Sequence, residues 1–156
     1  MKLHIEWTRP HKLRDGSKLN FIYTFDTEKL PKSPGVYIFA RRWGASFEAL
    51  YVGKATGLRG RIKNQFNNLR LMQHLKNAKA GNRVVLAGAL RTRPGQQRAK
   101  SLDLVERALI RYFLSEGHDL VNKQGTRLRR HEVVSDGSHP KRAFPRHIFV
   151  EKAKGE

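Results

Sequence analysis

The sequence predicts a small protein of the α/β (α+β) class, and two observations support this prediction. From residue 33 to residue 117 the patterns read strand, strand, helix, strand, helix, which is the order of a mixed layer. The chain has 156 residues, enough for one domain with an adequate core and no disulfide or structural metal. We therefore expect a domain over residues 33–125, an N-terminal extension over 1–32 and a basic C-terminal extension over 126–156.

The N-terminal extension shows two short strand patterns. Residues 3–7 (LHIEW) and 19–25 (LNFIYTF) alternate loosely around the turn signal Asp15-Gly16. This arrangement predicts a β-hairpin.

Two strands open the predicted domain. Residues 33–42 (SPGVYIFARR) and 49–54 (ALYVGK) are rich in β-branched and aromatic side chains, and about six residues separate them. If they form an antiparallel hairpin centred near Gly44, Tyr37 lies opposite Tyr51, because 37 + 51 is twice 44. Their side chains would then share one face of the sheet.

Two helices and a third strand follow. Apolar residues recur four apart over residues 57–68, and a second amphipathic stretch, 69–79 (LRLMQHLKNAK), runs toward a Gly-Asn break. Residues 83–90 (RVVLAGAL) predict a strand that is mostly buried. A polar loop over 91–100 comes next.

The last helix of the domain is expected over residues 101–116. Ser101 can cap its N-terminus, Asp103 stands in its first turn, and Gly117 marks its end. Patterning then fades, apart from one late strand at 147–152 (HIFVEK).

This last helix carries a carboxylate on its apolar face. At roughly 100° per residue, Leu102, Leu109 and Phe113 fall within about 40° of one another, and Glu106 lies about 20° beyond Phe113 at the edge of this apolar stripe. Burying an ionised Glu costs several kcal/mol unless a cation or hydrogen-bond donors meet it. Three interpretations follow: a structural ion pair with a basic residue, a carboxylate that reaches solvent, or a metal ligand.

The charge of the chain indicates a polyanionic partner. Lys and Arg number 32 against 13 Asp and Glu, for a net charge of +19 and a sequence pI near 11.0. Nucleic acid is the leading candidate. An anionic membrane would attract the same charge, but the chain lacks an amphipathic basic helix with exposed Trp or Phe. Solvated basic tails could also raise the count, but the charge is not only in the ends, because five cations lie in the patterned middle: Lys54, Arg59, Arg61, Lys63 and Arg70.

The absence of cysteine excludes disulfides and Cys-based zinc sites, and it suits a reducing compartment. The N-terminus lacks the apolar core of a signal peptide, so we expect a cytoplasmic protein. The seven His residues never fall at metal-binding spacings.

A cationic junction joins the second strand to the first helix, in the stretch LYVGKATGLRGRIKNQF over residues 50–66. It is no Walker A loop, because Glu48 and Ala55 stand where that loop needs Gly and Ser or Thr. Lys54 and Arg61 could bind a phosphate beside a helix N-terminus. The alternative is that these basic residues are merely solvated.

Five features in order resemble the GIY-YIG endonuclease superfamily over roughly residues 33–125. They are GVY at 35–37, YVG at 51–53, Arg61 ten residues beyond Tyr51, Glu106 on a later helix, and Asn122 in VNKQG. The segment PGVYIF…LYVGKATGLRGRI is especially similar to the GIY-YIG nuclease domain of the bacterial excinuclease.

The resemblance implies a small central antiparallel three-stranded sheet flanked by helices. It also implies a DNA endonuclease that uses one Mg²⁺ or Mn²⁺ ion held by Glu106. A guanidinium and a metal cation both stabilise the charge of a phosphodiester under attack. With 13 acids and no closely spaced Asp pair, one metal is expected rather than two, and Mg²⁺ needs only one or two carboxylates.

The same resemblance implies a role for each site residue. Tyr37 and Tyr51 would be hydrogen-bonding or proton-accepting phenols, and Arg61 would bind the phosphate and stabilise the transition state. Lys54 would be an electrostatic helper and Asn122 a group that shapes the site. From the cationic junction itself we also expect Arg59 and Gln65 to contact the substrate.

One position departs from the family pattern. Gln65 stands where members commonly have Tyr or His, and Gln cannot act as a base. The general base is then Tyr37, Tyr51 or a water activated by the metal. His74 could act as the base instead only if the chain folds back and places it at this site. A phenol has a reference pKa of about 10, and we expect the nearby cations to lower it.

Two other functions stay open: a non-catalytic nucleic-acid-binding module on this scaffold, and a basic RNA-associated protein.

Overall fold

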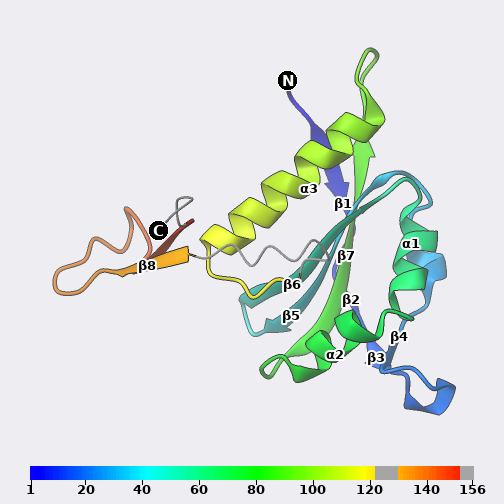
Figure 1. Ribbon diagram of the computed structural model, residues 1–156, viewed down its shortest axis with the longest axis horizontal. Coiled ribbons are helices and arrows are strands. Elements are labelled where there is room, and N and C mark those ends of the chain that lie inside the picture. Colours follow the sequence, from blue (N-terminus) through cyan, green and yellow to red (C-terminus); the bar gives the residue numbers. More distant parts are fainter. Residues whose placement is uncertain (122–129, 152–156) are drawn as a thin grey trace.

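The computed structural model of the protein describes residues 1–121 and 130–151. It shows an antiparallel sheet with helices on both faces, which confirms the mixed α+β class (Figure 1). Among the described residues, no helix combines the length and apolar character needed to cross a membrane.

The three predicted strands lie next to one another in the sheet, with the first of them in the middle. β5 (Gly35–Trp43) pairs with β6 (Ser46–Ala55) on one side and with β7 (Asn82–Arg91) on the other, and both pairings are antiparallel. β6 is therefore an edge strand, and its last residues lead into the cationic junction.

The sheet is wider than expected because the N-terminal segment joins it. β1 (His4–Trp7) and β2 (His11–Lys12) both pair with the outer side of β7, which makes five strands. Gly88 on β7 makes room for this, since a Cβ there would lie 2.5 Å from Ile5 Cγ2 and 2.9 Å from Trp7 Cε3.

The predicted N-terminal hairpin is therefore wrong in its partners. Residues 3–7 pair with β7, and only β3 (Arg14–Asp15) and β4 (Tyr23–Thr24) form a short ladder around the turn at Gly16. Two 3₁₀ helices, η1 (Ser17–Leu19) and η2 (Thr27–Lys29), flank β4.

The register of the central hairpin also differs from the prediction. Tyr37 lies opposite Gly53, and Tyr51 lies opposite Phe39. The tight turn pairs Trp43 with Ser46, and a bulge shifts the register between Phe39 and Ala40. Together these displace the pairing by two residues, so the two tyrosines still share a face, with ring centroids 5.9 Å apart.

The helices form close to their predicted positions. α1 (Leu58–Gln65) and α2 (Leu69–Asn77) lie on one face of the sheet, and α3 (Arg98–Ser115) lies on the other (Figure 1). α3 ends before Gly117, whose φ is +85°. It begins a turn earlier than predicted, with Gln97 as its N-cap, so Ser101 is a buried residue inside the helix and caps nothing.

Two apolar clusters result from strand alternation. The cluster under α1 and α2 contains Tyr37, Phe39, Leu50, Tyr51, Leu58, Ile62, Phe66, Leu71 and Leu75. The cluster under α3 contains Ile38, Ala40, Ala49, Val52, Val84 and Phe113. Successive residues of β5 thus serve opposite faces of the sheet.

A second two-stranded sheet lies near the C-terminus. The predicted late strand is confirmed as β9 (His147–Glu151), and it pairs with β8 (Arg130–Val134). β8 was not predicted, because its first half belongs to a basic run that hides the alternation of its second half. The ring of Phe149 lies against Gly117 at the end of α3.

Candidate functional site

The two motif tyrosines belong to a buried hydrogen-bond network beneath α1. Tyr37, Tyr51 and Gln65 are 1%, 6% and 3% exposed. Gln65 Nε2 donates to Tyr37 Oη at 2.6 Å and lies 3.5 Å from Tyr51 Oη, while Gln65 Oε1 accepts from Asn68 Nδ2 at 3.0 Å. Gln65 therefore joins the two phenols to the turn between α1 and α2, and both ends of its amide are engaged.

The environment of Tyr37 raises the pKa of its phenol. Burial is the main cause, because it disfavours the charged phenolate, and the neighbouring Tyr51 adds to the effect. The charge of Arg61 acts in the opposite direction but is a smaller influence. The expectation that nearby cations lower this pKa is therefore wrong, and the buried phenol favours its neutral form, with its oxygen accepting the hydrogen bond from Gln65.

A second group of charged residues lies on the α3 face of the sheet. Lys54 Nζ forms an ion pair with Asp103 Oδ1 and another, at 3.1 Å, with Glu106 Oε2. The Glu106 side chain is 23% exposed, whereas that of Asp103 is 62% exposed. Hydrogen bonds to Asp103 and then to Glu106 raise the pKa of Lys54. The carboxylate on the apolar stripe of α3 thus has a cation as its partner.

Asp103 is a site residue that the sequence analysis did not assign. It was treated there only as an acid in the first turn of a helix. Its spacing of three from Glu106 was the available signal, because residues i and i+3 of a helix lie on one face.

Strand alternation separates the two groups. Tyr51 packs in the α1 cluster, whereas Lys54 lies opposite Val36 and reaches α3 on the other face of β6. Among residues 1–121 and 130–151, no recorded hydrogen bond or ion pair joins the tyrosine network to the Lys54 cluster. The predicted residues therefore gather around one end of the edge strand, but on its two sides.

Two arginines near the start of α1 have different environments. The guanidinium of Arg59 donates to the Leu30 carbonyl at 2.8 and 2.9 Å, to the Glu28 carbonyl at 2.9 Å, and pairs with the Glu28 carboxylate at 3.1 Å. Arg59 thus ties η2 to α1, which favours a structural role over the predicted substrate contact. Arg61 is exposed, and within the described part of the chain its side chain has no recorded hydrogen bond or ion pair.

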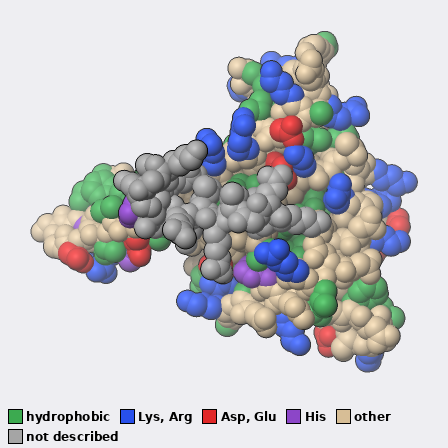
Figure 2. Space-filling view, viewed as in Figure 1, with side chains coloured by type: hydrophobic (Ala, Val, Ile, Leu, Met, Phe, Trp, Pro, Cys, Tyr) green, Lys and Arg blue, Asp and Glu red, His purple; other side chains and the backbone are tan. Residues whose placement is uncertain are grey.

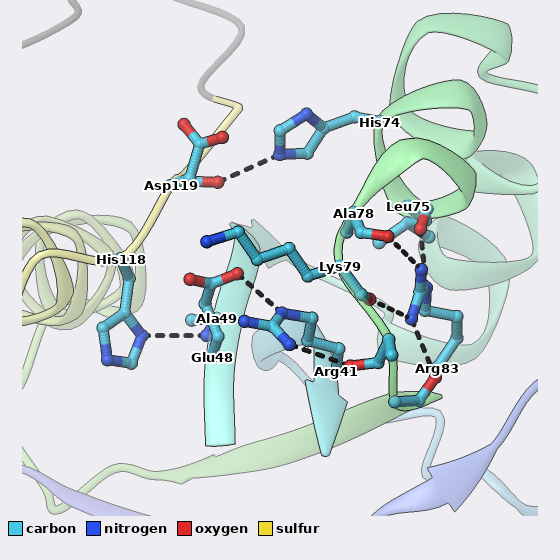
Figure 3. Close-up of polar contacts among 12 residues, drawn as sticks. Arg41, Glu48, Ala49, His74, Leu75, Ala78, Lys79, Arg83, His118 and Asp119 are labelled. Carbon is cyan, nitrogen blue, oxygen red and sulfur yellow. Dashed lines mark hydrogen bonds and ion pairs between the residues drawn. The ribbon is translucent and has the colours of Figure 1, made fainter. Parts of the chain in front are cut away.

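His74 does not join the phenols. Its Nε2 lies 2.9 Å from the carbonyl oxygen of Asp119, in the loop after α3 (Figure 3). In the same view, His118 Nδ1 accepts from the backbone N–H of Ala49 at 2.8 Å. Asn122, the remaining predicted contact, lies outside the described residues.

The described residues offer a limited ligand set for a metal. They contain no cluster of three or more His, Cys, Asp and Glu side chains that could hold an ion. Asp103 and Glu106 nevertheless supply two oxygen donors from one helix face. Mg²⁺ commonly uses one or two carboxylates together with waters and substrate phosphates, so this pair fits Mg²⁺ in competition with Lys54.

The surface charge of the described residues is dominated by cations. Lys and Arg side chains are spread over the visible face of the molecule, with few Asp and Glu among them (Figure 2). This distribution agrees with the net charge of +19.

Comparison of the chain with protein-family models, with curated proteins and with solved structures finds no match in any of the three. The resemblance to the GIY-YIG superfamily therefore stays a prediction from the motif residues.

Proposed function

We propose that this protein is a metal-dependent endonuclease that hydrolyses phosphodiester bonds, in DNA, with one Mg²⁺ or Mn²⁺ ion. The observation that supports the proposal most is the position of Glu106. Its carboxylate is largely buried on the sheet-facing side of α3, beside a second carboxylate, in a chain with few acids and a large cationic excess. Two carboxylates on one helix face are ligands that Mg²⁺ can use together with waters and phosphate oxygens.

Each residue of the site would contribute differently. Glu106 and Asp103 would hold the metal ion, which supplies positive charge to stabilise the phosphate during attack. Arg61 would bind a phosphate oxygen through its exposed guanidinium. Tyr37 and Gln65 would hold Tyr51 in position by the network beneath α1. Lys54 neutralises both carboxylates in the structure, and it would turn toward substrate phosphate when a metal takes its place.

The test is nicking of supercoiled plasmid with Mg²⁺, with EDTA as the metal-free control. Glu106→Gln keeps the size of the side chain and removes its charge, and we expect it to slow nicking by a factor of about 100 or more. Glu116→Gln, at the exposed end of the same helix, should leave the rate unchanged. The proposal is wrong if the wild-type protein cuts no form of DNA or RNA while it binds them tightly and in a salt-dependent manner.

A second candidate is a non-catalytic nucleic-acid-binding module on the same scaffold. Two observations favour it: Lys54 already satisfies both carboxylates, and Gln65 fills the place where the family commonly has a residue able to accept a proton. Measurement of Mn²⁺ binding separates the candidates. The nuclease requires binding that Glu106→Gln weakens, whereas the binding module requires none.

A further inference from the structure

The β5–β6 hairpin tip carries an exposed tryptophan held by a fixed arginine. Trp43 is 41% exposed, and the guanidinium carbon of Arg41 lies 3.8 Å from its ring centroid. Arg41 itself cannot move freely, because Glu48 Oε1 accepts from its Nε at 2.9 Å and the Ala80 carbonyl accepts from its Nη1 at 2.8 Å. Figure 3 shows Arg41 held between Glu48 and the loop that follows α2. The Trp43 ring is thus an exposed aromatic surface, and the fixed guanidinium of Arg41 packs against it.

A cationic cavity adjoins the same tip. Its volume is about 250 Å³, and it is lined by Pro10, Lys12, Arg42, Gly44, Asn82 and Val84. Two of these side chains are cations and none is a carboxylate. Within the described part of the chain, neither Lys12 nor Arg42 has a recorded ion pair or side-chain hydrogen bond. The cavity therefore offers donors and positive charge to an anion.

The chemistry of the two features matches a nucleotide. A base stacks on an aromatic ring, and its phosphate binds Lys and Arg, which is how proteins hold single-stranded nucleic acid. Successive residues of a strand point to opposite faces, so Arg42 and Trp43 lie on the two sides of the tip. A ligand that contacts both must bend around the hairpin and offer an unstacked base. A single strand can do this, whereas a stiff duplex with its bases paired cannot.

We propose that the β5–β6 hairpin tip is a binding site for single-stranded nucleic acid, with a base stacked on Trp43 and a phosphate in the cavity of Lys12 and Arg42. The site is distinct from the proposed cleavage site. Ser46 and Lys54 lie eight residues apart on β6, which at ~3.3 Å per residue is about 25 Å. The tip would therefore hold a single-stranded segment at a distance from the phosphate that is cut, and it would favour substrates that carry one.

The binding test uses a 5′-labelled oligo-dT of about 12 nucleotides and a duplex of equal length, in EDTA so that no turnover is required. The chain has two tryptophans, so Trp7→Phe leaves Trp43 as the reporter. Saturating oligo-dT should quench its fluorescence. Trp43→Leu should weaken oligo-dT binding by a factor of about 5 to 100 and change duplex binding far less. Trp43→Phe keeps a ring and should lose less than Trp43→Leu.

The cavity has its own readout. Lys12→Ala and Arg42→Ala should each lower the salt dependence of oligo-dT binding by about 0.7 in the slope of log K against log salt. Arg111→Ala removes an exposed cation from α3 and should leave that slope unchanged. A parallel titration with oligo-U tests RNA in place of DNA. Quenching of Trp43 fluorescence by either oligonucleotide supports the site.

Two results would overturn the inference. One is that saturating oligo-dT leaves the fluorescence of Trp43 unchanged in the Trp7→Phe protein. This measurement requires no substitution within the proposed site. The other is equal loss of single-strand and duplex binding in Trp43→Leu. Neither result depends on nicking, and the binding test contains EDTA, so failure of the nuclease proposal would be seen separately.

Discussion

Tyr37 and Gly53 lie opposite each other across the β5–β6 ladder, and the phenol of Tyr37 occupies the space that a side chain at residue 53 would need. A Cβ placed on Gly53 would lie 2.5 Å from both Tyr37 Cζ and Tyr37 Oη. This contact explains in physical terms why the second motif ends in glycine: any larger residue would push the first motif's tyrosine out of its network with Gln65.

Gly53→Ala should therefore destabilise the protein. We expect a loss of about 1–3 kcal/mol in the free energy of unfolding, because the buried ring of Tyr37 must shift to admit a methyl group. Gly60→Ala is the matched control, since Gly60 is exposed within α1 and a Cβ added there would have nothing within 4 Å. It should stabilise the protein by about 0.4–1 kcal/mol. Urea unfolding measures both, and equal effects of the two substitutions would contradict the packing argument.

Arg59→Ala and Arg61→Ala should separate structure from function. Arg59→Ala removes the contacts to η2 and should cost about 1–3 kcal/mol of stability. Arg61→Ala should change stability by less than about 0.5 kcal/mol, because the side chain is exposed, and should reduce turnover more than binding. Urea unfolding, plasmid nicking and DNA affinity are the measurements. Equal losses of binding and turnover in Arg61→Ala would mean that Arg61 only holds the nucleic-acid backbone.

Tyr37 and Gln65 should be energetically coupled. Tyr37→Phe leaves the buried amide of Gln65 without its partner at 2.6 Å, which costs about 1–3 kcal/mol. Gln65→Met removes that amide while keeping its length, so the double variant should be more stable than the sum of the two losses predicts. A double-mutant cycle in urea should give a coupling of about 1 kcal/mol. Additive losses would show that the hydrogen bond contributes nothing.

The Lys54 ion pairs should weaken at high pH. Asp103 and Glu106 raise the pKa of Lys54 in the folded protein, so its contribution is fully present below the pKa of the unfolded chain, about 10.4. It is lost as the pH rises through the higher folded value. The wild type should therefore be more stable than Lys54→Met at pH 7. The difference should be less than about 1 kcal/mol, because the cluster is exposed to solvent, and it should disappear above pH ~10.4. A difference that persists at higher pH would mean that the aliphatic chain, not the charge, is responsible.

Removal of Lys54 should also strengthen metal binding. If Asp103 and Glu106 hold a divalent ion, Lys54 competes for the same oxygens. Lys54→Met should then raise the affinity for Mn²⁺, in the absence of DNA, about fivefold or more. Calorimetry or electron paramagnetic resonance measures the gain, and Glu106→Gln in the same background should abolish it. An affinity that Lys54→Met leaves unchanged would place the metal elsewhere.

Much of the fold could be predicted because burial imposes a local pattern. The positions of β5, β6, β7, α1 and α2 follow from alternation or from apolar residues three and four apart. The start of α3 could not be predicted, since Ser101 looks like a cap and only packing shows that it is buried within the helix. The partner of β1 also depends on a distant residue, Gly88, whose missing side chain makes room for the strand.

The candidate site shows the same division. By itself the sequence determined which residue types are present and how they are spaced: two tyrosines, a cationic junction, a carboxylate on an apolar stripe, and a charge of +19. Only the tertiary structure decided their environments. It engaged Arg59 and exposed Arg61, buried Tyr37 so that its pKa rises, and brought Asp103 to Lys54 across 49 residues of chain. The physical reason is that spacing fixes which face a side chain occupies, whereas its partners and its exposure to water depend on the elements that pack against that face.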